Sequence, residues 1–393
     1  MPDEDPKMPP APDSTDATAK EATQTPAPSE VAPADIQPID ISKATPSSLK
    51  IVRILLIGMA LIVVAAGGFV WMMVKDNILS NNQDTSSTST TSTNTTPSPQ
   101  PLAQSSSTLT LDTKKNYGNE YASGLLPVGD SKYITTGAKK GYIYACNANF
   151  VSAGQAGAQV RGPWFTNNNT QWDINKKAAI MGKVTWQPSM SVQIKDGKRI
   201  ITTNDLPTHA TGVFPVASSD PARVYDANPN TIKAQSLTYS LAASPAKTDP
   251  SCMGGEVGVM LTGVALFDGF DAGGRDAGAW EVQDGCDGHP QNAGEYHYHT
   301  LSRCITDTTI QTVIGYALDG FPITGPKVGT NNMLTTDDLD ECHGITSEII
   351  LDGKKTTSYH YVMTQDFPYS VSCFRAAAIR APGIPENAGG PRP

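Results

Sequence analysis

The stretch Gly263-Val-Ala-Leu-Phe-Asp-Gly-Phe270 returns 52 positions later as Gly315-Tyr-Ala-Leu-Asp-Gly-Phe321. Each copy is followed, in the same order, by a cysteine near a histidine, a Tyr-His-Tyr triplet and a second cysteine. The offset grows from 52 at the leading glycine to 56, 63 and 69 further on, as insertions in loops would produce. Short motifs also match by chance, but four features in one order favour an internal duplication of a β-unit.

The patterns outside these copies also favour strands. Four short segments alternate or carry β-branched residues, and Gly, Pro, Asn or Asp bound them. They are Tyr142–Tyr144, Lys183–Trp186, Ser191–Ile194 and Arg199–Thr203. No long amphipathic helical pattern follows residue 110. The sequence therefore predicts a mainly β domain with long, ordered loops.

Composition excludes some classes of protein. Charged residues make up 17% of the 393 residues, against roughly 25% in average soluble proteins. Coiled coils need charge-rich repeats, so this class is excluded. The formal net charge of -9 argues against a nucleic-acid partner bound through a basic face.

An uncharged run of 21 residues, Ile54–Val74, is long enough to cross a bilayer as a helix. A cleaved signal peptide is the alternative, but its apolar core is shorter and lies nearer the N-terminus. Lys43, Lys50 and Arg53 precede the run, whereas Lys75 and Asp76 nearly cancel after it. The positive-inside rule then places the N-terminus in the cytoplasm and the C-terminal part outside the cell membrane, in a single-pass arrangement.

The remaining organisation follows from local composition. The expected parts are a disordered cytoplasmic tail (1–48), a transmembrane helix (51–75), a Ser/Thr-rich stalk (76–108), an extracytoplasmic β domain (109–380) and a disordered tail (381–393). The two tails and the stalk are too polar, or too rich in Pro and Gly, to bury a core.

All six cysteines lie after the apolar run, as expected for disulfides in an oxidising compartment. If the two copies are equivalent, the simplest pairing is Cys286–Cys304 and Cys342–Cys373, which leaves Cys146–Cys252. Six cysteines allow fifteen connectivities, and the sequence does not choose among them.

Five of the six histidines fall in the duplicated region. Alternate residues of a strand share a face, so His297 and His299 would project together, with Tyr296 and Tyr298 opposite. Two imidazoles at this spacing can bind one transition metal ion, such as Cu, Zn or Fe. The other histidines are candidates for completing the site: His209, His289, His343 and His360. The alternative is a polar strand face with no ligand.

An acidic, Gly-rich stretch contains Asp268, Asp271, Asp276 and Glu281. Calcium is a weaker expectation there, because the stretch lacks the alternating ligand positions of an EF-hand loop. Gly-rich turns that contain Asp are more often simple tight loops.

Tyr296-His-Tyr-His299, Cys286-Asp-Gly-His289 and Gly315-Tyr-Ala-Leu-Asp-Gly-Phe-Pro-Ile-Thr-Gly-Pro326 together resemble the YHYH domain family. Further matches are Asn204–His209, Leu339–Gly344, Tyr359–Tyr361 and Asp366–Tyr369, so the resemblance covers roughly residues 200–375. The resemblance implies an exported or membrane-anchored protein and supplies no established activity. Val362 stands where a second four-residue signature would have histidine.

These patterns predict a membrane-anchored protein whose exposed β domain binds a transition metal through its His-x-His strand. One alternative is a surface recognition module for glycan or protein partners that uses Trp164, Trp172, Trp186 or Trp280 for stacking, unless these rings are core. Another is a metal-dependent hydrolase or oxidoreductase, which needs an open coordination position and a cleft.

Overall fold

The computed structural model describes residues 109–151 and 157–382. The predicted cytoplasmic tail, membrane span and stalk lie outside these residues, as does the predicted C-terminal tail from residue 383. Within the described part of the chain, no helix has the length and apolar character needed to cross a membrane.

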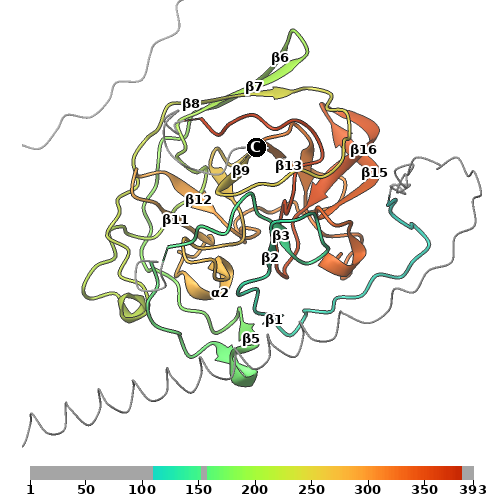
Figure 1. Ribbon diagram of the computed structural model, residues 1–393. Coiled ribbons are helices and arrows are strands. Elements are labelled where there is room, and N and C mark those ends of the chain that lie inside the picture. Colours follow the sequence, from blue (N-terminus) through green and yellow to red (C-terminus); the bar gives the residue numbers. More distant parts are fainter. Residues whose placement is uncertain (1–108, 152–156, 383–393) are drawn as a thin grey trace, which may run out of the picture. The chain divides into compact units, whose positions relative to one another are not determined.

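The centre of the described domain is an eight-stranded sheet with the order β11-β12-β10-β9-β13-β14-β16-β15 (Figure 1). Its strands are β9 (Glu256–Met260), β10 (Ala265–Phe267), β11 (Gly288–Pro290), β12 (Tyr296–Tyr298), β13 (Val313–Ala317), β14 (Pro322–Thr324), β15 (Gly344–Leu351) and β16 (Lys354–Val362). All five residues of β9 are buried, as expected for a strand in the middle of a sheet covered on both faces.

The sheet has the same order on both sides of its central antiparallel pair, β9 and β13. Each central strand forms an antiparallel hairpin with the next strand of the chain, β10 or β14. That strand runs parallel to β12 or β16, and β11 or β15 closes the edge by antiparallel pairing. We refer to β9–β12 as the first half-sheet and to β13–β16 as the second half-sheet.

The two central hairpins turn in the same way. The amide of Gly263 donates to the carbonyl of Met260 at 2.9 Å, and that of Gly320 donates to Ala317, also at 2.9 Å. Both glycines have positive φ, +97° and +91°, a region that side chains other than glycine rarely adopt. The turns thus align Gly263 with Gly320, whereas the sequence match aligns it with Gly315, which lies within β13.

Smaller sheets and short helices surround the central sheet (Figure 1). One small sheet contains β6 (Met190–Lys195), β7 (Lys198–Thr203) and β8 (Leu237–Ala242), a second contains β1 (Leu125–Pro127), β5 (Gln171–Asp173) and β4 (Phe165–Thr166), and a third contains β2 (Tyr133–Ile134) and β3 (Ile143–Tyr144). In residues 109–151 and 157–382 the helices are α2 (Ala277–Trp280) and the 3-10 turns η3 (Asn167–Asn169), η4 (Pro221–Val224) and η5 (Thr336–Asp338).

The prediction of a mainly β domain with few helices is confirmed for the described residues. Three of the four segments predicted as strands overlap β3, β6 and β7. The fourth, 183–186, is not a strand and makes only an isolated bridge between Val184 and Thr211. Its side chains are half-buried or exposed, so little apolar packing holds it against a neighbouring strand.

Three disulfides cross-link the domain. This confirms the prediction, made from the even number of cysteines, that all six form disulfides. They join Cys146 to Cys252, Cys286 to Cys304, and Cys342 to Cys373. This is the pairing that follows when the two copies are treated as equivalent. Two of the bridges are local, with separations of 18 and 31 residues, and each belongs to one half-sheet.

Candidate metal centre

Along β12 and His299, the residue that follows it, tyrosines and histidines point to different sides. The hydroxyl of Tyr296 donates to the Asp284 carboxylate at 3.0 Å, and that of Tyr298 donates to Thr262 at 3.2 Å. His297 and His299 instead line a cavity. The side chains therefore alternate as the period of a strand requires.

A third imidazole comes from the neighbouring strand. β11 pairs with β12 in antiparallel register, and this register puts His289 directly opposite His297. Facing residues of such a pair have Cβ atoms about 5 Å apart, so their rings meet. One potential ligand atom each from His289, His297 and His299 lies within 4.8 Å of the other two. We call these three residues the imidazole cluster.

The hydrogen bonds of two rings determine where their protons lie. Nδ1 of His299 is 2.5 Å from the carbonyl oxygen of Asp268, and Nδ1 of His297 is 3.3 Å from that of Glu295. A carbonyl oxygen only accepts, so each Nδ1 carries the hydrogen and each neutral ring has its lone pair on Nε2. The two Nε2 atoms are 3.1 Å apart. Two acceptors therefore face each other.

Glu281 adds a carboxylate to the imidazole cluster. It is the C-cap of α2, a helix whose N-cap, Asp276, accepts from the amide of Ala279. Its Oε2 lies 3.3 Å from Nε2 of His289 and 3.3 Å from Nε2 of His299. Among the described residues, this oxygen and both ring nitrogens of His289 lack a hydrogen-bond partner. Such orphaned buried polar atoms are uncommon and call for an explanation.

Burial dominates the electrostatics of the site. Each of the three rings is at most 4% exposed. Loss of solvent lowers the pKa of His289 and of His297 well below the usual range, and that of His299 to about 4. The same loss of solvent raises the pKa of Glu281. Neutral imidazole, the form that binds metals, is thus the favoured state of all three rings near neutral pH.

The imidazole cluster and Glu281 line one wall of a cavity of about 820 Å³. Phe267 stacks on His297 with ring centroids 4.1 Å apart, which fixes the plane of that ring. The size is within the range of small-molecule sites. An ion held by the imidazole cluster would therefore be reachable from the cavity.

The histidines of the second half-sheet region have hydroxyl partners instead of neighbouring imidazoles. Nδ1 of His360 is 2.9 Å from the Thr324 hydroxyl, and Nε2 is 2.8 Å from the Ser347 hydroxyl. His343 has a hydroxyl partner too, with Nε2 3.0 Å from Oγ1 of Thr364. Both histidines are buried and lie outside the imidazole cluster. Hydrogen bonding within the core accounts for them.

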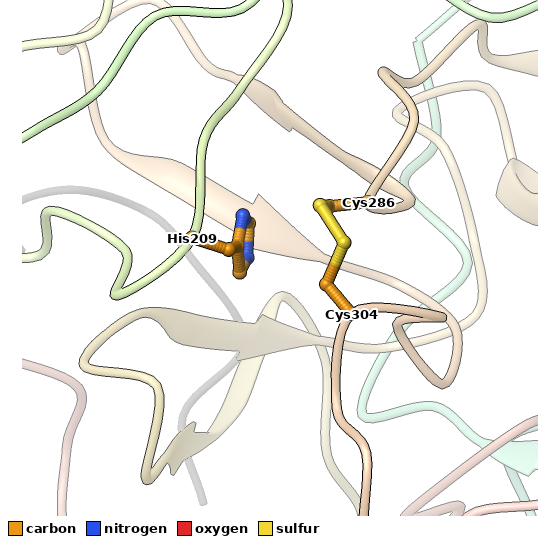
Figure 2. A group of neighbouring side chains, drawn as sticks. All are labelled: His209, Cys286 and Cys304. Carbon is orange, nitrogen blue, oxygen red and sulfur yellow. A yellow bond between two sulfur atoms is a disulfide. The ribbon is translucent and has the colours of Figure 1, made fainter.

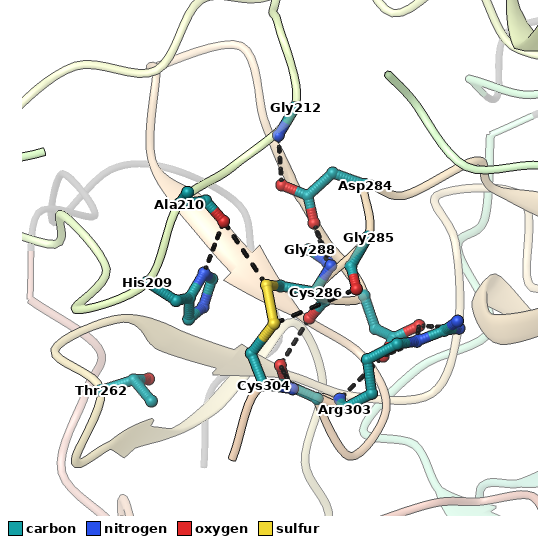
Figure 3. The surroundings of a disulfide bond; sticks show 12 residues. His209, Ala210, Gly212, Thr262, Asp284, Gly285, Cys286, Gly288, Arg303 and Cys304 are labelled. Atoms are coloured by element: carbon teal, nitrogen blue, oxygen red, sulfur yellow. Dashed lines mark hydrogen bonds and ion pairs between the residues drawn. A yellow bond between two sulfur atoms is a disulfide. The ribbon is translucent and has the colours of Figure 1, made fainter. Parts of the chain in front are cut away.

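The sixth histidine lies on the tyrosine side of β12, beside a disulfide (Figure 2). His209 has potential ligand atoms within 4.8 Å of the sulfurs of Cys286 and Cys304, but these sulfurs are bonded to each other and offer no thiolate. Its Nδ1 is 3.0 Å from the carbonyl oxygen of Ala210, and its Nε2 contacts the Tyr298 hydroxyl. The Ala210 carbonyl oxygen also lies 3.4 Å from Sγ of Cys286, so this loop packs directly on the bridge (Figure 3).

The carboxylates considered for calcium have protein partners. Asp268 accepts from the amides of Gly255 and Phe270, Asp271 accepts from Arg275, and Asp276 accepts from the Tyr369 hydroxyl. These contacts are those of tight turns and a helix cap. Only Glu281 of the stretch has an oxygen without such a partner. Its position beside the histidines was missed in the sequence, because only the path of the chain through α2 brings it there.

Most of the tryptophans considered as stacking groups belong to the core. Trp164, Trp172 and Trp280 are buried, with at most 7% of their surface exposed. Trp186 is half-buried, and its indole N–H donates to Thr211 at 3.0 Å. Three of the four rings are therefore closed to a partner at the surface.

The model of a family described as YHYH protein matches residues 238–336. This range runs from within β8 to the first residue of η5 and contains the whole imidazole cluster. The expected resemblance is thus confirmed over this part of the chain. No curated protein and no solved structure matches the chain.

Proposed function

We propose that the chain binds one transition metal ion through the imidazole cluster, with Glu281 as a fourth donor or as its immediate neighbour. The observation that carries the proposal is the 3.1 Å contact between Nε2 of His297 and Nε2 of His299. The carbonyl partners of both Nδ1 atoms leave a lone pair on each Nε2. Two facing lone pairs repel each other unless a cation lies beside both.

The second support is the set of unpaired atoms around that contact. His289 has no hydrogen-bond partner at either nitrogen among the described residues, and Oε2 of Glu281 has none. A bound ion would satisfy Oε2 of Glu281 and one of the two ring nitrogens of His289 together. The carbonyls of Asp268 and Glu295 would then act as the outer partners that orient metal-binding imidazoles.

The donor set defines the class of metal. Imidazole nitrogens suit Zn, Cu, Fe and Ni, whereas Ca²⁺ prefers six to eight oxygen donors. Three nitrogens and one carboxylate oxygen are also enough for the tetrahedral geometry of zinc. Calcium is therefore the weaker assignment.

Metal analysis of the purified full-length chain tests the proposal. The protein is stripped with a chelator, reloaded with Zn²⁺, Cu²⁺ or Co²⁺, desalted and measured for metal by mass spectrometry. We expect about one ion per chain for at least one metal. Absence of retained metal at micromolar protein and equimolar ion would contradict the proposal.

An enzyme remains the second candidate, because the cavity of about 820 Å³ opens onto the imidazole cluster. If an ion has three nitrogen ligands, a fourth position can face the cavity, which is the usual arrangement of catalytic zinc. Glu281→Gln separates the two roles. Loss of metal would identify Glu281 as a ligand and a structural site, whereas retained metal would leave Glu281 free to act on a bound molecule.

We also propose that the β domain is carried outside the cell by a single membrane span at residues 54–74. The length of the uncharged run and the excess of basic residues before it support this proposal. Three disulfides in the domain are typical of an oxidising compartment. Protease treatment of intact cells should remove the domain and leave the N-terminal tail protected; a protected domain would contradict the orientation.

An internal duplication is the simplest origin of the two half-sheets. The shared strand order, the two equivalent hairpin turns and the two local disulfides support it. On this interpretation the ancestral unit carried a Tyr-His-Tyr strand. Only the first copy then acquired, or kept, the further histidines of the imidazole cluster.

A further inference from the structure

The cavity beside the imidazole cluster has a definite chemical character. Among the described residues that line it, none is lysine or arginine. Two cations act on Glu281 from outside this lining, and both have partners. Arg275 is engaged by the Asp271 carboxylate and the carbonyl of Ala158, and Lys177 donates to the carbonyl of Gly278 and to the side chain of Gln283. An anionic molecule that enters the cavity would therefore meet no cationic side chain to replace its lost hydration.

Carboxylates in the wall add to this effect. Asp226 and Asp268 accept from backbone amides, and Asp271 accepts from Arg275, so their oxygens are held in place. Before any metal ion is bound, their negative charges disfavour a phosphate or a carboxylate within the cavity. Ligands of these two kinds are recognised elsewhere by arginine, lysine or helix N-termini.

The rest of the wall suits an apolar, ring-sized body. Phe150, Phe267, Phe270 and Met253 line the cavity. Phe150 and Phe270 meet edge to face with centroids 5.6 Å apart, so they form a continuous aromatic surface. Uncharged amides, including those of Asn149 and Asn230, lie on the same cavity and supply polar contacts without charge.

We propose that this cavity binds an uncharged small molecule with an aromatic or similarly apolar body, and that a neutral nitrogen or oxygen of that molecule coordinates the metal. The coordinating part of this inference rests on the proposed metal site. The selection for a neutral, apolar body rests on the cavity alone.

Three probes of graded chemistry test the inference on the cobalt-loaded full-length protein. They are imidazole, 4-phenylimidazole and phenyl phosphate, and the visible absorption of the bound Co²⁺ reports coordination. We expect 4-phenylimidazole to bind at least tenfold more tightly than imidazole, because burial of its phenyl group adds apolar contact. Phenyl phosphate should bind more weakly than 4-phenylimidazole. Equal affinities for the two azoles, or tightest binding of phenyl phosphate, would overturn the inference.

A second arm does not depend on the metal. Calorimetry with the metal-free protein compares indole, a neutral aromatic, with benzoate. We expect measurable binding of indole only, even if no metal is ever retained. If the protein binds indole but retains no metal, the metal site is contradicted and the inference about the cavity stands. If it retains metal but does not bind indole, the inference about the cavity is contradicted and the metal site stands.

A variant that adds a positive charge at the cavity tests whether the discrimination against anions arises there. Asn149 is exposed at the cavity and tolerates a longer side chain. Asn149→Lys should bring benzoate binding into the measurable range, whereas Ala148→Lys, a neighbour outside the cavity lining, should not. An equal gain in both variants would mean that the anion responds to overall charge and would count against a neutral-selective cavity.

Discussion

The two half-sheets share one strand order, but the histidine of their common Tyr-His-Tyr triplet has different surroundings in each. In the first, His297 faces His289 across the β11–β12 pair. In the second, His360 faces Ile345 across β15–β16 and bonds two hydroxyl groups. The triplet itself specifies a strand with tyrosines on one face and histidine on the other. Whether the histidine belongs to a site or to the core depends on which side chains face it.

One further difference separates the half-sheets, at equivalent positions of β10 and β14. Leu266 of β10 lies opposite Tyr298, and Ile323 of β14 lies opposite Tyr361. The residues that follow are Phe267, which stacks on His297, and Thr324, which contacts His360 at 2.9 Å. A ring that packs on an imidazole leaves its nitrogens free, whereas a hydroxyl occupies one. The second half-sheet thus shows the surroundings of the same histidine where hydroxyl groups occupy its nitrogens.

The largest expected effect is the loss of metal from the first half-sheet. His297→Ala combined with His299→Ala removes two donors and should weaken metal binding by more than about 100-fold, since loss of even an outer partner costs ten- to 100-fold. Metal content after reloading and desalting measures it. His209→Ala, which removes a histidine from the opposite face of β12, should retain about one ion per chain. Equal retention by both variants would show that the imidazole cluster is not the binding site.

The next effect distinguishes the two local disulfides. Cys286→Ser with Cys304→Ser opens the 18-residue segment that carries the whole imidazole cluster, and Cys342→Ser with Cys373→Ser opens a 31-residue segment that carries none of it. Loop-closure entropy predicts losses of about 3 and about 4 kcal/mol in the free energy of unfolding. Denaturant titration measures these losses.

Metal affinity should respond to the first disulfide only. Removal of the Cys286–Cys304 bridge frees β11 and β12 to separate and should reduce affinity at least tenfold by the loss of preorganisation. Removal of the Cys342–Cys373 bridge should leave affinity unchanged while the domain is folded. A similar fall in both variants would mean that global stability, rather than the local staple, controls the site.

The third effect is a pH dependence that belongs to the second half-sheet. Tyr361 donates to the carboxylate of Asp319 at 2.6 Å, whereas Tyr298 donates to the neutral Thr262. Burial raises the pKa of Asp319 to about 6. The folded state therefore holds this proton more tightly than the unfolded chain, for which the pKa is about 4. The stability that Asp319 contributes is fully present below pH 4 and is lost as the pH rises through 6.

The difference in unfolding free energy between the wild type and Asp319→Asn isolates this contribution. As the pH falls from 7 to 4, the unfolding free energy of the wild type should rise relative to that of the variant by up to roughly 3 kcal/mol. The reason is that a shift of one pKa unit corresponds to 1.36 kcal/mol. Chemical denaturation across this range measures it. Other buried carboxylates, such as Asp276, titrate equally in both proteins and cancel. A difference that does not vary with pH would contradict a raised pKa in the folded protein.

The smallest effect concerns a single hydroxyl in the second half-sheet. Thr324→Val keeps the shape of the side chain but removes the partner of Nδ1 of His360. A buried nitrogen without a partner should cost about 1–2 kcal/mol in thermal or denaturant unfolding. Thr324→Ser keeps the hydroxyl and should cost less. An unchanged stability of Thr324→Val would contradict a stabilising hydrogen bond, because this variant keeps the methyl packing.

Local sequence patterns were enough to predict several features of this structure. Alternation in Tyr296–His299 predicts two imidazoles on one face, because successive side chains of a strand point to opposite sides whatever surrounds them. An even number of cysteines predicts three disulfides, whereas the observed pairing follows from the sequence only if the two copies are equivalent. The β character of the domain likewise follows from short, β-branched segments between turn residues, although the segment 183–186 shows that such a pattern alone does not secure a strand.

Tertiary structure decided which groups meet at the imidazole cluster. Sequence left four histidines as equal candidates for completing it, and only the antiparallel register of β11 with β12 brings His289 to His297. The C-terminal end of α2 brings Glu281 there as well. His360 lies between two tyrosines as His297 does, yet hydroxyl groups contact both of its ring nitrogens. A hydroxyl also contacts Nε2 of His343. The physical reason is that pairing register and burial are set by long-range packing, whereas the period of a strand is set by the backbone itself.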